Sequence, residues 1–211
     1  FHNQFSVSHI GKNFVVSNND KSLSKFISQF KKQLMLRPKT IFDIGEKSLH
    51  TADEGKMTIN TDGTCFGDLW RDAVAARSNA TFLVFESSSG SSHSWTYAEF
   101  DDVVARAAAK LTGLGVTQGD SVNLALTNSP AFVALWLASI RLGAWIVPSD
   151  PQSRTQELIE HQSRTQTRVG VCSVHRKDEF LAAAQSIPVI VIDEDDCELA
   201  VFGTEKFIDW P

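Results

Sequence analysis

Cysteine is scarce and irregularly spaced in this chain. The 211 residues include three cysteines, Cys65, Cys172 and Cys197, which is an odd number without the paired spacing of metal ligands. This pattern argues against a disulfide-stapled scaffold and favours free thiols in a reducing compartment, so we expect a cytoplasmic protein. None of the six histidines pairs at H-x-x-x-H spacing, which argues against a zinc site.

Long apolar runs are also missing. The longest candidate, residues 131–147, is interrupted by Ser139, Arg141 and Gly143, and a membrane-spanning helix needs about 20 apolar residues. The polar, mixed start does not resemble a signal peptide. We therefore predict no transmembrane segment.

Positive charge is in deficit, and the deficit is uneven. Residues 1–64 hold nine Lys/Arg and six Asp/Glu, whereas residues 65–211 hold eleven and nineteen. The shift predicts a domain boundary here, with an N-terminal extension at 1–64 and the main domain at 65–211. The acidic majority of the main domain argues against nucleic acid as a partner.

The N-terminal extension has two recognisable patterns. Residues 5–16 alternate around Gly11-Lys12-Asn13 and predict a hairpin. Ser22 is a plausible N-cap for a helix to about Leu36. Its apolar residues share one face, as in a helix that binds a membrane surface or a partner, but also as in any helix packed on a core.

From Phe66 onward, strands alternate with helices, which predicts an α/β fold with a mostly parallel sheet flanked by helices. Thr96 and Glu99 form a capping-box pattern, and Ser129-Pro130 is a strong helix start. Ser153 or Thr155 is expected to cap a helix ending near Ser163. The apolar segments 144–148 and 188–192 predict strands covered on both faces, and residues 202–210 suggest a last hairpin.

Few residues carry an obvious chemical signature. The sequence has no G-x-x-x-x-G-K-[ST] loop and no G-x-S-x-G elbow, and Gly113-Leu114-Gly115 is better explained as a helix C-cap than as a phosphate cradle. The acidic run Asp193–Asp196 follows a strand and could bind a metal, although most such runs are solvated turns. Arg176-Lys177 follows a strand where α/β sheets place ligand-contacting loops, so a phosphate contact is plausible there.

Four motifs appear in a fixed order between Thr96 and Pro151. They are Thr96-Tyr97-Ala98-Glu99-Phe100; Leu114-Gly115-Val116 with Gly119-Asp120 and Val122; Asn128-Ser129-Pro130-Ala131-Phe132; and Leu142-Gly143-Ala144 ahead of Pro148-Ser149-Asp150-Pro151. In this order and spacing they resemble the N-terminal portion of adenylate-forming (AMP-binding) enzymes, which include acyl-CoA ligases. The resemblance covers about residues 66–185.

The resemblance implies a carboxylate activator. In such an enzyme, ATP with Mg and a carboxylic acid give an acyl-adenylate, and coenzyme A or a carrier-protein thiol then takes the acyl group. The loop Ser149, Asp150 and Pro151, and the basic pair Arg176 and Lys177, resemble regions that approach coenzyme A. The family's ATP loop and its C-terminal catalytic lysine have no counterpart in this sequence. No catalytic residue and no metal ligand is therefore assigned to this chain, and it is expected to hold no cofactor by itself.

Several interpretations stay open at this point. The chain is expected to be a fragment of an acyl-CoA ligase-like enzyme that is inactive alone. Alternatives are a fragment of a peptide-synthetase adenylation domain, a non-catalytic remnant that binds a partner, and an unrelated doubly wound binding domain. A homodimer is also left open.

Overall fold

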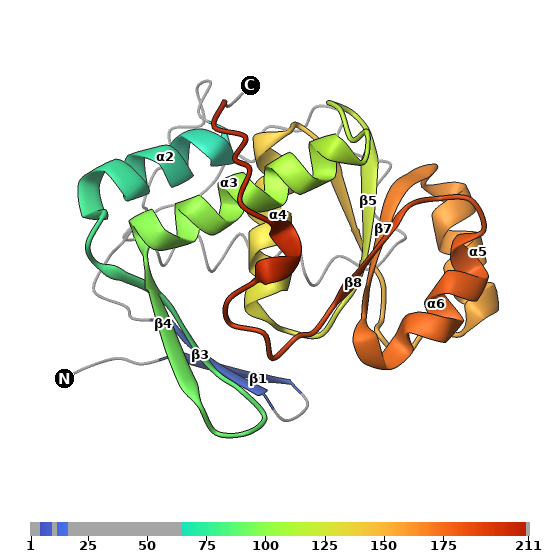
Figure 1. The fold of residues 1–211 in the computed structure, drawn as a ribbon, viewed down its shortest axis with the longest axis horizontal. Helices are drawn as coiled ribbons and strands as arrows, with labels where there is room; N and C mark the ends of the chain where they lie inside the picture. Colours follow the sequence, from blue (N-terminus) through green and yellow to red (C-terminus); the bar gives the residue numbers. More distant parts are fainter. Residues whose placement is uncertain (1–4, 10–11, 17–64, 210–211) are drawn as a thin grey trace, which may run out of the picture.

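A computed structural model describes residues 5–9, 12–16 and 65–209 of the protein. β1 (Phe5–His9) and β2 (Lys12–Val16) pair antiparallel and form the predicted N-terminal hairpin. β2 continues onto β3 (Thr81–Glu86), which pairs with β4 (Ser92–Thr96) to complete a four-stranded antiparallel sheet (Figure 1). The predicted Ser22–Leu36 helix and the approach to the predicted boundary at residue 64 lie outside the described residues.

A second, fully parallel sheet forms the body of the domain. Its strands stand in the order β6-β5-β7-β8. Their bounds are β5 Ser121–Ala125, β6 Trp145–Pro148, β7 Thr167–Ser173 and β8 Val189–Ile192. The predicted α/β class with a parallel sheet is therefore confirmed.

Helices cover both faces of this sheet (Figure 1). Helices α3 (Tyr97–Gly113) and α4 (Pro130–Arg141) pack together on one face, and α5 (Thr155–Arg164) and α6 (Lys177–Ala184) pack together on the other. Helix α2 (Phe66–Arg77) packs on α3. Two short 3₁₀ turns, η1 (Val174–Arg176) and η2 (Ala200–Phe202), follow β7 and β8. Consecutive helices change face between α4 and α5, so the sheet is doubly wound.

Local sequence signals set the ends of the longest helices. The Thr96 hydroxyl accepts the Glu99 amide at 3.2 Å, and the Glu99 carboxylate accepts the Thr96 amide at 2.7 Å, which completes the predicted capping box. The Ser129 hydroxyl caps α4 at the Phe132 amide. Gly115 adopts a φ of +85° after α3, as predicted for the residue that ends the helix. Residues that carry a side chain rarely adopt this backbone conformation.

The prediction of a strand covered on both faces is wrong for residues 144–148, whereas residues 189–192 do pack in apolar clusters on both faces. Both segments form edge strands, and β6 is half-buried to exposed along its length, with Trp145 67% exposed. β8 alternates between half-buried and buried residues. The central strand β5 is the one that is buried throughout, although Ser121 and Asn123 made it look less apolar. Composition alone could not separate an edge strand from a central one, because position in the sheet depends on the other strands.

Two further expectations are corrected. Residues 202–210 form no hairpin in the described part of the chain; η2 and an extended segment cross α3, where Phe207 donates its amide to Ala105 O. The N-cap of α5 is Arg154 rather than Ser153 or Thr155, because the Glu157 carboxylate accepts the Arg154 amide at 2.9 Å and so supplies the cap from within the helix.

Within the described ranges, no helix is both long and apolar enough to cross a membrane.

Candidate functional site

The carboxyl edge of the parallel sheet is where this fold can hold a ligand. The chain leaves β5 toward α4 on one face and leaves the adjacent β7 toward α6 on the other, so the loops diverge at this edge, which is where α/β sheets of this kind bind ligands. All five predicted site residues lie at this edge. Ser149, Asp150 and Pro151 follow β6, while Arg176 and Lys177 follow β7.

Ser149 is buried and its hydroxyl is committed to the protein. Ser149 Oγ accepts from Asn123 Nδ2 at 2.7 Å and lies 3.2 Å from His161 Nδ1. The Ser149 amide donates to Leu124 O, which continues the strand pairing. Since Asn123 supplies the donor to Ser149, the hydroxyl hydrogen is free to point at His161. Ser149 therefore anchors the loop instead of presenting its hydroxyl to a ligand.

Asp150 and Pro151 form the exposed part of this loop. Asp150 Oδ1 accepts the Gln152 amide at 2.8 Å, and the Asp150 carbonyl accepts the Ser153 amide at 2.9 Å. Asp150 is exposed and Pro151 is half-buried. The turn is closed by its own backbone and held by Ser149, so its surface is pre-formed.

Arg176 joins the two predicted loops. Its Nη2 donates to Ser153 O at 3.1 Å, and its Nη1 lies 3.6 Å from Glu179. Its Nε is buried and has no hydrogen-bond partner among the residues that the structure describes. Burying an N–H without a partner is unfavourable. Because this Nε is closed to solvent, an added acceptor would reach Arg176 only through the rest of its partly exposed guanidinium.

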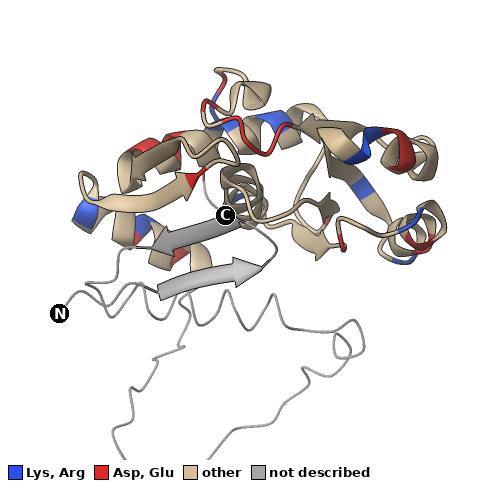
Figure 2. Ribbon diagram, turned by 90° about the horizontal axis from the view of Figure 1, so that it is seen from below, with Lys and Arg blue, Asp and Glu red and all other residues tan. Residues whose placement is uncertain are grey.

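Lys177 is exposed, and no ion pair holds it within the described ranges. Figure 2 shows that basic and acidic residues are mixed along the described elements. The partly engaged Arg176 and the exposed Lys177 give this loop hydrogen-bond donors for an anion.

The acidic run Asp193–Asp196, which follows the adjacent strand β8, is engaged by hydrogen bonds from the protein itself. Glu194 is 7% exposed, and its Oε1 accepts the amide of Thr127 at 2.5 Å and the hydroxyl of Thr127 at 2.6 Å. This contact ties the loop after β8 to the loop after β5, across the end of β7. Glu194 is a residue whose role the sequence did not show, because its partner lies 67 positions away.

The other carboxylates of this run also have internal donors. Asp195 accepts the amide and the hydroxyl of Ser88, in the β3–β4 turn, and so links the two sheets. Asp193 accepts the Asp195 amide, and Asp196 accepts the amides of Glu198 and Ala200. No cluster of potential metal ligands is found among the described residues. The run is thus a set of turn and loop contacts.

The buried thiol is poorly suited to nucleophilic chemistry. Burial raises the pKa of Cys172 to about 11; the charge of Lys177 opposes this rise and the charge of Glu194 adds to it. The Cys197 pKa is also raised, first by burial and then by the neighbouring carboxylates Asp196, Asp195 and Glu198. A thiol that stays protonated at neutral pH is a weak nucleophile.

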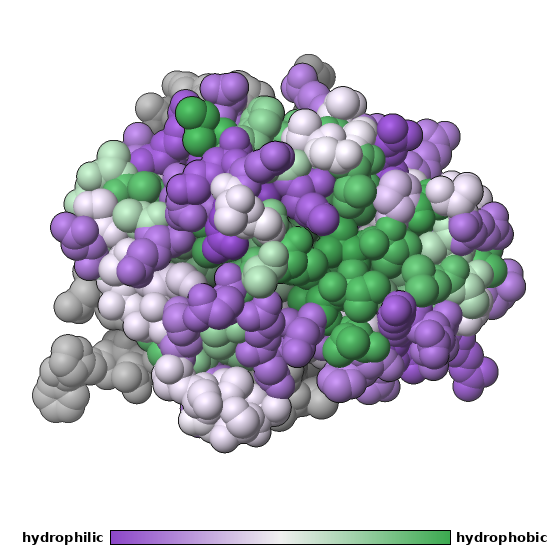
Figure 3. Space-filling view, in the orientation of Figure 1, coloured by the Kyte–Doolittle hydropathy of each residue, from purple (hydrophilic) through white to green (hydrophobic). Residues whose placement is uncertain are grey.

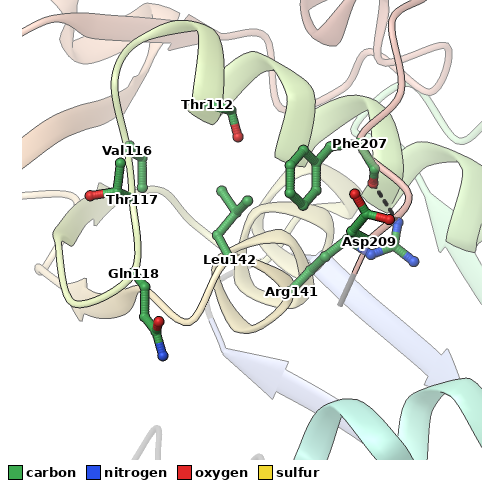
Figure 4. A pocket seen from close by; sticks show the side chains of 8 residues that line it. All are labelled: Thr112, Val116, Thr117, Gln118, Arg141, Leu142, Phe207 and Asp209. Carbon is green, nitrogen blue, oxygen red and sulfur yellow. Dashed lines mark hydrogen bonds between the residues drawn. The ribbon is translucent and has the colours of Figure 1, made fainter. Parts of the chain in front are cut away.

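A cavity of about 300 Å³ lies at the other end of the sheet. Figure 4 shows its lining: Thr112, Val116, Thr117, Gln118, Arg141, Leu142, Phe207 and Asp209. Arg141, its most buried charge, donates to Asp101 at 2.8 Å and to Phe207 O at 3.2 Å. Burial lowers the Arg141 pKa, while Asp101 opposes the shift. The guanidinium therefore fastens α4 to α3 and to the C-terminal segment, and the cavity lies away from the predicted site residues.

Comparison with solved structures places this fold among acyl-CoA synthetases and ligases. The acyl-CoA synthetase from Brucella canis superimposes with a TM-score of 0.52 at 21% identity, over 60% of this chain and 25% of that one. A benzoate CoA ligase from Burkholderia xenovorans gives 0.57 at 17% identity, over 69% and 29%. At these identities the likeness establishes the fold.

The sequence relatives have higher identity to this chain than the solved structures do, but they match it over shorter stretches. 4-Coumarate–CoA ligase 3 from Oryza sativa subsp. japonica is 37% identical over 103 residues, 47% of this chain. A crotonobetaine/carnitine–CoA ligase from Citrobacter koseri is 33% identical over 89 residues, 42% of this chain. The matches span only 18% and 17% of the two relatives.

A protein-family model settles the relationship. The model described as AMP-binding enzyme matches residues 70–210, which include the parallel sheet, its flanking helices and the loops at its carboxyl edge. The predicted resemblance is therefore confirmed, and this chain belongs to the AMP-binding enzyme family.

Proposed function

We propose that this chain is the N-terminal part of a carboxylate-activating ligase. The complete enzyme would use ATP to convert a carboxylic acid into an acyl-adenylate and pyrophosphate, and coenzyme A would then displace AMP to give the thioester. The observation that carries this proposal is the family match over residues 70–210, together with relatives that are CoA ligases by name. Those names favour coenzyme A over a carrier protein as acceptor.

The loops at the carboxyl edge would serve one step of this chemistry, the approach of coenzyme A. The partly exposed guanidinium of Arg176 and the exposed ammonium of Lys177 offer hydrogen-bond donors of the kind that phosphate oxygens accept. We propose that these two side chains and the pre-formed Ser149–Pro151 turn contact the phosphates of coenzyme A as it approaches. ATP and Mg would be held by other parts of the complete enzyme, because the family's ATP loop has no counterpart in this sequence. The cytoplasmic location remains a prediction.

The chain alone is proposed to be inactive. The test measures carboxylate-dependent exchange between pyrophosphate and ATP, and thioester formation with coenzyme A, for the natural gene product and for residues 1–211 prepared separately. Exchange and thioester formation by the natural product, with none by residues 1–211, would support the proposal. Exchange by residues 1–211 would contradict the inactivity of this segment, and no ligation by a longer natural product over a broad panel of acids would contradict the ligase assignment.

A further inference from the structure

A small polar cluster lies between β5, the loop after β6 and helix α5. Asn123 of β5 is fully buried, Ser149 is 7% exposed, and His161 of α5 is half-buried. Gln162 of α5 is 8% exposed, and its Nε2 donates to Asn123 Oδ1 at 3.5 Å. The sheet around the polar cluster is largely apolar, and Figure 3 shows a continuous hydrophobic area where Figure 1 draws β7 and β8. Buried polar groups in such surroundings are unfavourable unless they are hydrogen-bonded, so the bonds within the cluster restrict the three elements to one arrangement.

The direction of these hydrogen bonds follows from one backbone carbonyl. Val147 O can only accept, so the Asn123 group that lies 2.9 Å from it is the amide nitrogen, Nδ2. The second hydrogen of this nitrogen points at Ser149 Oγ, which accepts it at 2.7 Å. The Ser149 hydroxyl therefore keeps its own hydrogen for another acceptor, and His161 Nδ1 lies 3.2 Å from the oxygen.

The polar cluster holds the turn that the proposed function uses. Asn123 ties Ser149 to the sheet, and His161 ties the same hydroxyl to α5. The turn begins at Ser149 and closes when Asp150 accepts the amides of Gln152 and Ser153. Two contacts from two different elements thus fix the residue from which the turn starts.

We infer that His161 is a positioning residue for the Ser149–Pro151 turn. As a neutral imidazole with its hydrogen on Nε2, it accepts the Ser149 hydroxyl at Nδ1 and completes a chain of donors that runs from Asn123 through Ser149 to α5. An imidazolium, or the other neutral tautomer, carries a hydrogen on Nδ1 and leaves the Ser149 hydroxyl without this acceptor. His161 acts through Ser149, and only the statement that the positioned turn receives coenzyme A rests on the proposed function.

Two substitutions separate the acceptor on His161 from its packing. His161→Asn keeps an acceptor, because its side-chain oxygen can take the place of Nδ1, whereas His161→Leu keeps apolar bulk and favours the helix. Hydrogen exchange of the Gln152 and Ser153 amides in residues 1–211 measures how firmly the turn is closed. We expect exchange about five- to tenfold faster in His161→Leu, as for the loss of one hydrogen bond, and nearly unchanged in His161→Asn. Equal rates in all three proteins, or faster exchange in His161→Asn than in His161→Leu, would overturn the inference.

Ser149→Ala tests whether the effect of His161 passes through Ser149. His161→Leu should add little to the exchange rates of Ser149→Ala, whereas additive increases would show independent roles and contradict the inference. Ser163→Ala, at an exposed position of α5, is the matched control and should leave the rates unchanged. Circular dichroism verifies that each variant is folded.

The ring nitrogen signals of His161 give a direct readout of the tautomer. They are assigned in NMR spectra by their loss in His161→Asn. At neutral pH they should show a hydrogen on Nε2 and none on Nδ1. A hydrogen on Nδ1 would overturn the inference, because the ring could not then accept the Ser149 hydroxyl.

Titration with coenzyme A separates this inference from the proposed function. Severalfold weaker binding in His161→Leu, with binding like the wild type in His161→Asn, would support both. A wild type that does not respond to coenzyme A, with exchange rates in the predicted order, would overturn the proposed role of the turn and still support positioning by His161. Binding and exchange that are both unchanged in His161→Leu would overturn the inference alone.

Discussion

Two charged loops at the carboxyl edge, the basic Arg176-Lys177 side after β7 and the acidic Asp193–Asp196 side after β8, differ in how many of their charged groups already have hydrogen-bond partners in the protein. On the basic side, Arg176 holds one carbonyl and keeps a buried Nε without a partner in the described residues, while Lys177 is exposed. On the acidic side, Glu194 and Asp195 each accept two hydrogen bonds from other loops. In the sequence, both sides are simply short charged runs after strands.

The difference shows why charge alone does not identify a site. The acidic-side carboxylates hold separate loops together through these hydrogen bonds, so the acidic side stabilises the fold. A partly exposed guanidinium beside an exposed ammonium retains donors for an anion. Removing acidic-side groups should therefore lower stability, whereas removing basic-side groups should change binding.

The largest effect is expected for Glu194→Ala. This change leaves the Thr127 amide and hydroxyl without their acceptor and separates the loops after β5 and β8. We expect the free energy of unfolding to fall by about 3 kcal/mol, because hydrogen bonds to charged groups contribute about 1.5–3 kcal/mol each and part of the loss is recovered by water. Urea denaturation measures it. Glu194→Gln, which keeps an acceptor of the same size, is the control, and equal stability of all three proteins would contradict the structural role.

Asn123→Ala should have the next largest effect. Asn123 is fully buried and donates to Val147 O at 2.9 Å as well as to Ser149 Oγ. Its loss should cost about 2 kcal/mol of unfolding free energy by leaving buried acceptors unsatisfied. Hydrogen exchange should show faster exchange at the Ser149 amide. If stability falls but that exchange rate is unchanged, Asn123 does not hold the loop.

Acidification should lower the free energy of unfolding by less than either of these substitutions, through the loss of the contribution from Asp120. The Asp120 pKa is lowered from 3.8, first by the hydrogen bond from the Thr117 amide and then by that from the Thr117 hydroxyl. A carboxyl whose pKa is lower in the folded state contributes stability above its unfolded pKa, and this contribution is lost as the pH falls through the folded value. As the pH falls below 3.8, the free energy of unfolding should therefore decrease less for Asp120→Asn than for the wild type. Parallel curves for the two proteins would contradict this.

The smallest effect on stability is expected for Lys177→Ala. This exposed side chain has no ion pair in the described ranges, so the free energy of unfolding should change by no more than about 0.5 kcal/mol. Coenzyme A binding should nevertheless weaken severalfold. Lys110→Ala, which removes an exposed lysine from α3, is the control for net charge. A loss of stability near that of Glu194→Ala would show that the two sides do not differ as described.

Sequence reasoning succeeded where the determinants are local. The Thr96–Glu99 box, the Ser129-Pro130 start and the Gly115 stop each depend on residues within one turn, and each lies where it was predicted. It failed where the outcome depends on distant residues. Whether residues 145–148 are buried depends on which strands lie beside them, and the residue that holds Glu194 is 67 positions away.

The candidate site shows the same division. Alternating strands and helices were enough to place Arg176-Lys177 and Ser149–Pro151 at one edge of the sheet. That Arg176 bridges the two loops through Ser153 O, and that Ser149 turns its hydroxyl toward Asn123 and His161, could not be predicted, because both contacts form between separate elements.

Titration of residues 1–211 with coenzyme A, followed by amide chemical shifts in two-dimensional NMR spectra, tests the central claim most directly. We predict shifts at Ser149, Asp150, Arg176 and Lys177, with the amides of Asp193–Asp196 unchanged, and loss of these shifts in the Arg176→Ala/Lys177→Ala double variant. Shifts confined to the acidic side, or shifts that persist in the double variant, would contradict the assignment of the basic side as the approach for coenzyme A.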